Sequence, residues 1–178
     1  MKKLLLVLLL VLTSTLVAQT DTVKYPTSEE MGITPGMTDS AIIICCSDWI
    51  TNNIKYDTVL YNMVVKSNYE FERWKHPKRK KKRFTINSYD FRRLYDSTQT
   101  PVVILRDRKA VCYGASLLLV SMLASYGIES REYTVEGATH SIVQINEDLY
   151  IDPTPPVGLE GYTNYCVLLS KDDVKTLY

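Results

Sequence analysis

Histidine is scarce in this sequence, with only two among 178 residues. His76 lies in a run of basic residues, and His140 lies in a segment whose pattern predicts a strand. Proton transfer near neutral pH is most often carried out by histidine. If the protein uses such a base, that base is therefore His140.

The cysteine pattern argues against a structural zinc site, and the short apolar runs argue against a membrane-spanning protein. No CxxC pair occurs among the four cysteines, so we expect no structural zinc site. We also expect no cofactor. Cys45 and Cys46 are neighbours, and a bond between them strains the backbone, whereas a pairing of one of them with Cys166 stays open. No apolar run reaches the about 20 residues needed to cross a bilayer. We therefore expect no stable membrane span in the mature chain.

The first 19 residues have the three-part pattern of a secretory signal peptide. Lys2 and Lys3 precede the apolar run Leu4–Leu12, and small polar residues follow up to a predicted cleavage site near Ala18 or Gln19. An uncleaved signal anchor is the alternative that the pattern leaves open. The prediction is a secreted or periplasmic protein with a signal peptide at 1–19.

The remaining chain predicts one globular domain behind a short arm. Residues 20–37 contain Pro and Gly at intervals and predict an irregular N-terminal arm, and residues 38–178 predict the domain. The apolar fraction of 46% is typical of a folded chain. Seven basic residues fall within 75–83, which predicts a solvated loop, with contact to polyanions as the alternative. An exported protein without aromatic residues interleaved in that run is not expected to bind nucleic acid.

Two helices and several strands are predicted, which indicates an α+β fold. One helix begins at Thr38 or Asp39 and keeps an apolar face out to about Tyr56. The second, 112–126, is apolar nearly all round and ends at Gly127, as expected for a central helix. Three strands follow at about 130–135, 140–145 and 149–152, and 167–169 is a candidate fourth strand. Residues 58–100 are harder to assign: Val59–Val65 is either a strand or a helical extension, and Thr85–Tyr95 shows no clear period.

Burial favours one register for the hairpin that contains His140. With Asn146, Glu147 and Asp148 as a three-residue loop, Ile145 faces Leu149 and Val143 faces Ile151, so the apolar side chains share one face. Ile142 then lies across from Asp152 on the other face. His140 becomes the diagonal neighbour of Asp152, at a distance that side chains can bridge.

Cys112 has the position of an activated thiol. It begins the central helix, where free N–H groups and the helix dipole favour a thiolate, and Gly114 leaves space for another segment to approach. A Cys, a His and a carboxylate beside that His are the parts of a nucleophilic triad. Each of the three residues also has a purely structural interpretation. The cysteine would be a buried thiol, the histidine a hydrogen-bonded strand residue, and the aspartate a turn former before Pro153. Their joint placement favours the functional interpretation.

The order of these segments resembles the transglutaminase-like domain, a branch of the papain-like thiol enzymes. The resemblance is carried by VCYGASLLLVSMLASYGIESREYTVEG, ATHSIVQI and LYIDPT, and upstream by SDWITNNIKYD. It implies a papain-like core in which Cys112 is the nucleophile, His140 the general base and acid, and Asp152 the orienting carboxylate. Two positions depart from the family pattern: Ala110 replaces a frequent Gly, and Ile142 replaces the usual Trp, which implies a reshaped substrate groove.

The resemblance also implies a function. We expect a cysteine peptidase or amidase that acts on a peptide or protein substrate, a cell-wall peptide among the candidates. The alternatives are a transglutaminase that transfers the acyl group to an amine, and a non-catalytic binding module that retains the fold. The backbone N–H of Cys112 is expected to donate to the oxyanion. Gln99 and Trp74 are candidates for the second donor, each with a surface or core role as the alternative.

Overall fold

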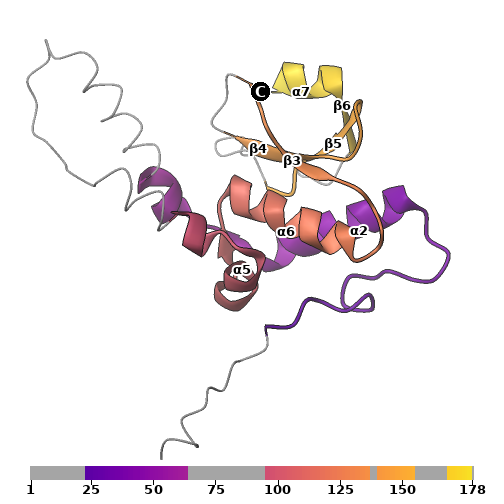
Figure 1. Cartoon of the computed structure of the whole chain (residues 1–178), viewed down its shortest axis with the longest axis horizontal. Helices are drawn as coiled ribbons and strands as arrows, with labels where there is room; N and C mark the ends of the chain where they lie inside the picture. Colours follow the sequence, from indigo (N-terminus) through magenta and orange to yellow (C-terminus); the bar gives the residue numbers. More distant parts are fainter. Residues whose placement is uncertain (1–22, 64–94, 137–139, 155–167, 178) are drawn as a thin grey trace, which may run out of the picture.

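A computed structural model describes residues 23–63, 95–136, 140–154 and 168–177 (Figure 1). In chain order its elements are α2 (Asp39–Asn53), β1 (Lys55–Tyr56), α5 (Pro101–Asp107), β2 (Lys109–Ala110), α6 (Cys112–Ala124), β3 (Arg131–Thr134), β4 (Ser141–Gln144), β5 (Leu149–Ile151), β6 (Leu168–Ser170) and α7 (Lys171–Leu177). The α+β class predicted from the sequence is confirmed. Within the described ranges, no helix combines the length and the apolar character that a membrane span requires.

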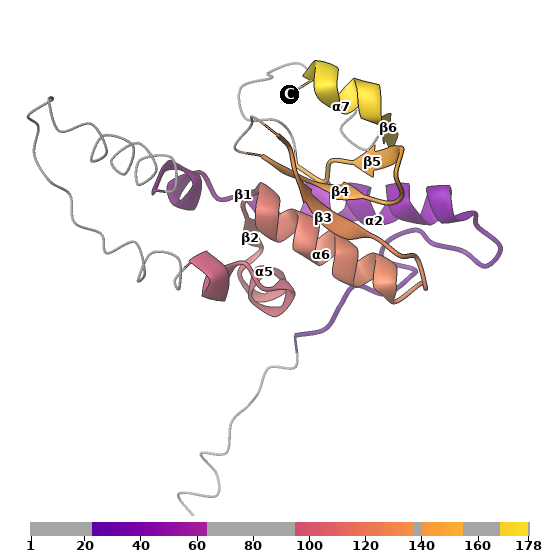
Figure 2. The same cartoon turned by 45° about the horizontal axis from the view of Figure 1, so that its top comes forward.

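The architecture is layered around a four-stranded antiparallel sheet in the order β3-β4-β5-β6. Helices α6 and α2 cover one face of this sheet, and α7 lies on the other side (Figures 1 and 2). This arrangement creates two hydrophobic cores, one on each side of the sheet. The larger one lies between the helices and the sheet and includes Ile43, Ile50, Leu118, Leu119, Val143 and Ile151, whereas Val135, Ile142, Tyr150 and Val174 form the smaller one beneath α7.

Helix α6 is the centre of the larger core, as its apolar sequence predicts. Leu118, Leu119 and Leu123 are fully buried, and the helix contacts α2, α5 and the sheet. The helix ends at Ala124, and the chain turns through Gly127, which adopts a positive φ of 73°. A left-handed residue after a helix is usually glycine because it has no Cβ to clash. The predicted end of this helix is confirmed to within two residues.

Helix α2 starts where the sequence predicts and ends earlier. The side chain of Thr38 accepts a hydrogen bond from the N–H of Ala41, which caps the first turn. The predicted extension to Tyr56 is wrong, because the helix ends at Asn53 and Lys55–Tyr56 forms β1 instead. The N–H of Lys55 donates to Arg108 at 2.9 Å, so a backbone partner distant in sequence replaces the next helical hydrogen bond.

The hairpin register predicted from burial is confirmed. Val143 pairs with Ile151, and the N–H of Ile145 donates to Leu149 at 2.8 Å. The observed strands are one or two residues shorter than the predicted ones. Ile142 is fully buried in the smaller core with Val174. The expectation that Ile142 reshapes a substrate groove is therefore wrong, because a side chain closed off by α7 cannot line a groove.

The arm and the remaining cysteines complete the described chain. Residues 23–37 contain no helix or strand, yet Met31 and Ile33 reach the larger core. For residues 59–65 the sequence left a strand or a helical extension open, and the described part of this segment, up to Met63, is helical. Cys45, Cys46 and Cys112 are free thiols. Cys166, Trp74, the signal segment and the basic run at 75–83 lie outside the described residues.

Candidate active site

Cys112 is the first residue of α6, and its side chain is buried. The N-cap residue, Val111, has an extended backbone and makes no side-chain capping bond. The first N–H groups of a helix have no partner within the helix, and they carry the positive end of its dipole. A thiol at this position therefore lies against backbone donors that can stabilise negative charge.

Gln99 holds the backbone just before this helix. Its side-chain Oε1 accepts a hydrogen bond from the N–H of Val111 at 3.0 Å, and the residue is only 2% exposed. The space that the sequence assigned to an approaching segment is occupied by this amide, because a Cβ on Gly114 would overlap Gln99 Oε1. Gln99 thus fixes the N-terminal end of α6, and through it the position of Cys112.

His140 and Asp152 are in direct contact. His140 Nε2 lies 2.8 Å from Asp152 Oδ2, and the two side chains are 13% and 4% exposed. The other carboxylate oxygen, Oδ1, accepts hydrogen bonds from the N–H and the hydroxyl of Thr154, both at 2.9 Å. Asp152 is therefore held by its own turn while it faces the imidazole. Because Nε2 faces the carboxylate, Nδ1 is the ring nitrogen left for Cys112.

The surroundings of His140 favour its charged form. Burial lowers the pKa of the imidazole, but the hydrogen bond to Asp152 and a further one to Cys112 outweigh burial and raise the pKa to about 9. The same interactions bring the thiol, the imidazole and the carboxylate into one connected group. All three residues predicted from the sequence are therefore brought together.

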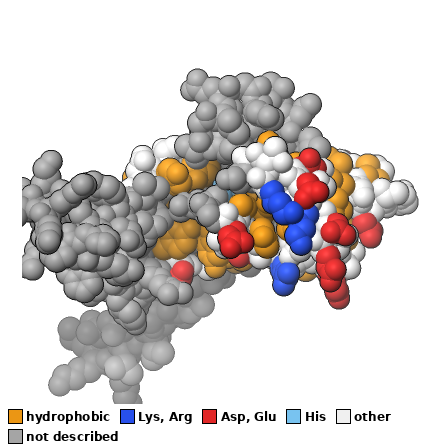
Figure 3. All heavy atoms as spheres, turned by 90° about the horizontal axis from the view of Figure 1, so that it is seen from above, with side chains coloured by type: hydrophobic (Ala, Val, Ile, Leu, Met, Phe, Trp, Pro, Cys, Tyr) orange, Lys and Arg blue, Asp and Glu red, His pale blue; other side chains and the backbone are white. Residues whose placement is uncertain are grey.

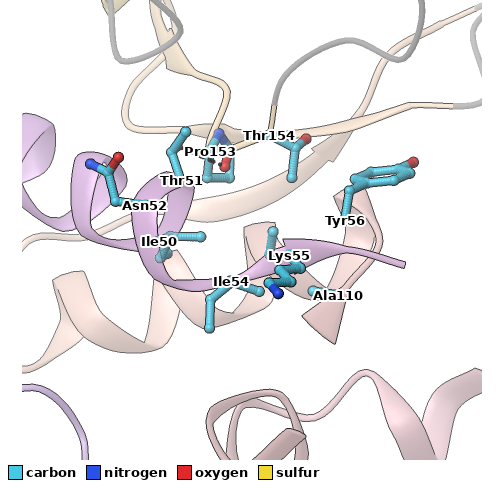
Figure 4. Close-up of a pocket in the computed structure, with 10 residues that line it drawn as sticks. Ile50, Thr51, Asn52, Ile54, Lys55, Tyr56, Ala110, Pro153 and Thr154 are labelled. Atoms are coloured by element: carbon cyan, nitrogen blue, oxygen red, sulfur yellow. Dashed lines mark hydrogen bonds between the residues drawn. The ribbon is translucent and has the colours of Figure 1, made fainter. Parts of the chain in front are cut away.

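Three hydrogen bonds between distant segments hold this group in place. Gln99 bonds the residue before Cys112, as described above. The hydroxyl of Ser116 on α6 donates to the carbonyl of Ser141, which follows His140, at 3.1 Å. The hydroxyl of Thr51 on α2 donates to the carbonyl of Pro153, which follows Asp152, at 3.2 Å (Figure 4). Each member of the group thus has a backbone neighbour tied to another element.

Two tyrosines that the sequence did not single out lie beside Cys112. Burial, together with the nearby Cys112, raises the pKa of both Tyr56 and Tyr95. Tyr95 stacks on Tyr113, the residue after Cys112, with ring centroids 5.7 Å apart. The available sequence signal was weak, because a two-residue strand such as β1 is too short to show a period.

A hollow of about 260 Å³ lies beside this group (Figure 4). Its walls come from the end of α2, from β1 and β2, from Ala115 on α6, and from Pro153 and Thr154 after Asp152. The lining is mainly apolar, with hydroxyl groups from Thr51, Tyr56 and Thr154. The hollow is lined by Ala110 and Ala115, two residues before and three residues after Cys112, and by Pro153, which follows Asp152, and this makes it a candidate subsite for a substrate group.

The described surface carries no ligand set for a metal. No group of three or more His, Cys, Asp or Glu side chains within the described ranges is arranged to hold a metal ion.

On the face that bears α7, acidic and basic side chains are interspersed (Figure 3), in keeping with Lys171, Asp172, Asp173 and Lys175 on that helix. This face has no single sign of charge that would select a polyanion.

The chain was also compared with known proteins. A family model described as a transglutaminase-like domain matches residues 30–176. No curated protein and no solved structure matches the chain. The matched range includes all the described helices and strands except the last residue of α7, and it contains Cys112, His140 and Asp152.

Proposed function

The chain belongs to the transglutaminase-like domain family, and from this premise we propose that it is an exported thiol enzyme that cleaves peptide or isopeptide amides. The family generally contains cysteine enzymes with a papain-like core. The observation that carries the proposal is the 2.8 Å contact between His140 Nε2 and Asp152 Oδ2, with Cys112 close enough to the same imidazole to raise its pKa. A binding module has no need for these three groups in mutual contact.

In the proposed first step, the Cys112 thiol transfers its proton to Nδ1 of the neutral imidazole of His140, and the raised pKa of that imidazole favours the resulting thiolate–imidazolium pair. The thiolate attacks the carbonyl carbon of the amide, a C–S bond forms, and the π electrons of the carbonyl move to its oxygen. The oxyanion accepts a hydrogen bond from the backbone N–H of Cys112 at the start of α6. The C–N bond then breaks, and the leaving amine takes the proton from the imidazolium, which leaves a thioester on Cys112.

In the second step, water replaces the amine. His140 removes a proton from the water molecule as it attacks the thioester, and the thiol is regenerated with release of a carboxylic acid. Asp152 keeps the imidazole in the tautomer that presents Nδ1 to the thiol and stabilises the imidazolium that forms. Transfer to a primary amine follows the same path with the amine in place of water.

Cys112 reactivity tests the enzyme proposal. We expect Cys112 in the wild-type protein to react with iodoacetamide near pH 6 faster than an ordinary thiol, which is almost fully protonated there. His140→Ala should lower the alkylation rate of Cys112 to that of an ordinary thiol. Cys112→Ala identifies the residue that is labelled. If Cys112 reacts at the ordinary rate and His140→Ala changes nothing, the enzyme proposal fails and a binding module remains.

A second experiment separates hydrolysis from transfer. A casein digest is incubated with the wild-type protein and dansylcadaverine, and mass spectrometry follows both peptide loss and label incorporation, with Cys112→Ala as control. Cleaved peptides without label support a peptidase or amidase. Incorporation that exceeds cleavage would assign the protein as a transglutaminase instead.

Export is the remaining part of the proposal. The pattern at residues 1–19 supports a cleaved signal peptide and a secreted or periplasmic location, where a cell-wall peptide is an available substrate. Mass spectrometry of the protein recovered from its host should give a mature N-terminus near Ala18 or Gln19. An intact Met1 on the recovered protein would contradict cleavage.

A further inference from the structure

The hairpin formed by β4 and β5 loses a backbone donor at its open end. Extended by two residues, the register of these strands places Ser141 opposite Pro153. Hydrogen-bonded pairs alternate with unbonded pairs along antiparallel strands, and the bond between Ile145 and Leu149 puts Ser141 and Pro153 at a bonded position. Proline has no N–H to donate. The carbonyl of Ser141 therefore cannot receive its regular ladder hydrogen bond from the neighbouring strand.

The direction of the Ser141 carbonyl agrees with this register. The carbonyl of His140, one residue earlier, accepts a hydrogen bond from the N–H of Val135 at 3.0 Å and so points toward β3. Successive carbonyls of a strand point to opposite sides, so the Ser141 carbonyl points toward the side of Pro153. Because Ser141 follows His140 and Pro153 follows Asp152, the missing bond lies directly beside the imidazole and the carboxylate.

Ser116 supplies a donor to this carbonyl. Its hydroxyl donates to the carbonyl oxygen of Ser141 at 3.1 Å, and its side chain is fully buried. Helix α6, which bears Ser116, packs against β4 (Figure 2). Residues four apart on a helix are neighbours on one face, so Ser116 lies one turn beyond Cys112 on the same face of α6. A hydroxyl on the helix of the nucleophile thus takes the place of the N–H that Pro153 lacks.

We propose that Ser116 is a positioning residue, whose hydroxyl ties the strand that follows His140 to the helix that begins with Cys112 and so sets the distance between imidazole and thiol. The inference rests on the proposed function, because a thiol needs an imidazole at a fixed distance only if the two exchange a proton. Ser116 itself touches neither the substrate nor the reacting atoms. It acts through the backbone of Ser141.

The loss of this hydroxyl should disturb one contact of the triad and leave the other. His140 and Asp152 belong to one hairpin, and their 2.8 Å contact moves with it. Cys112 belongs to α6, and the Ser116 hydrogen bond joins this helix to the hairpin. A buried carbonyl that loses its donor is costly, so the strand should shift toward another donor. The imidazole would then move relative to the thiol while it keeps its carboxylate partner.

The pH profile of Cys112 alkylation by iodoacetamide tests this role. Its midpoint reports how much of the thiol is ionised, whatever the reactivity of the thiolate. We expect the wild-type midpoint to lie well below the value of about 8.5 of an ordinary thiol. Ser116→Ala removes one oxygen atom and adds none, and it should raise the midpoint by about one unit, because a displaced imidazolium stabilises the thiolate less. Ser116→Thr keeps the hydroxyl and should keep the wild-type midpoint.

A double-mutant cycle separates positioning from general support of the fold. If Ser116 acts through His140, Ser116→Ala should leave the midpoint of His140→Ala unchanged. The matched control is Ser121→Ala on the same helix, whose hydroxyl bonds the Tyr25 hydroxyl at 2.8 Å instead of the hairpin. It should leave the wild-type midpoint unchanged.

Four outcomes would overturn the role of Ser116. The first is an equal rise of the midpoint in the wild-type and His140→Ala backgrounds, which would assign the effect to α6 alone. The second is no rise in Ser116→Ala. The third is a rise of about one unit in Ser116→Thr, which retains the donor, and the fourth is an equal rise in Ser121→Ala. If the wild-type midpoint is that of an ordinary thiol, the thiol-enzyme function itself fails, and the inference fails with it.

Discussion

The ionisation of His140 gives a prediction about stability that can be worked through in magnitude and sign. The pKa rises from 6.5 to about 9 on folding, because the hydrogen bonds to Asp152 and Cys112 outweigh burial. Each pKa unit corresponds to about 1.4 kcal/mol, so the protonated imidazole stabilises the fold by about 3 kcal/mol. A raised pKa means that this contribution is complete below pH 6.5 and is lost as the pH rises through 9.

Urea unfolding at several pH values measures this contribution. The free energy of unfolding is determined between pH 6 and pH 10 for the wild type and for His140→Gln, and the difference between the two is plotted. Subtraction removes the contributions of other titrating groups. We expect the difference to fall by about 3 kcal/mol between pH 6.5 and pH 9. A difference that stays level or grows over this range would refute the view that Asp152 holds a charged imidazole.

The imidazole itself can be followed by NMR, since the chain has only two histidines. A His76→Gln background leaves a single signal, which should titrate near pH 9. In Asp152→Asn the burial of the ring remains but its anionic partner is gone, so the pKa should fall well below its wild-type value. An unchanged titration in Asp152→Asn would assign the raised pKa to some other group.

Three further predictions concern the segments that support the site. Gly114→Ala should destabilise the protein by about 1–3 kcal/mol in urea unfolding, because its Cβ would overlap the buried Gln99 amide; a neutral result would mean that this amide moves freely. Thr154→Val removes one hydrogen bond to the Asp152 carboxylate and should cost about 1–3 kcal/mol, while Thr154→Ser should retain most of the stability. Thr38→Ala should cost about 1 kcal/mol in thermal or urea unfolding by removing the cap of α2, and Thr38→Asp should not.

The sequence by itself determined the elements whose pattern is long or whose partners are close in the chain. Helix α6 is apolar on all sides over 13 residues, so only a central position can bury it. The hairpin register follows from alternation and a three-residue loop, and it brings together His140 and Asp152, which are 12 residues apart. For these features local geometry and burial leave one acceptable arrangement.

Only the tertiary structure decided what surrounds Cys112. Strands β1 and β2 have two residues each, which is too short for any periodicity, and their pairing ends α2 before Tyr56. The Gln99 amide on Val111, the Ser116 hydroxyl on Ser141 and the Tyr56 phenol beside Cys112 are contacts between separate elements. Such contacts depend on how whole helices and sheets pack, because each polar group is satisfied by whichever distant segment the packing brings to it. The sequence therefore determined which thiol, imidazole and carboxylate meet, and the packing decided which groups hold them and face the substrate.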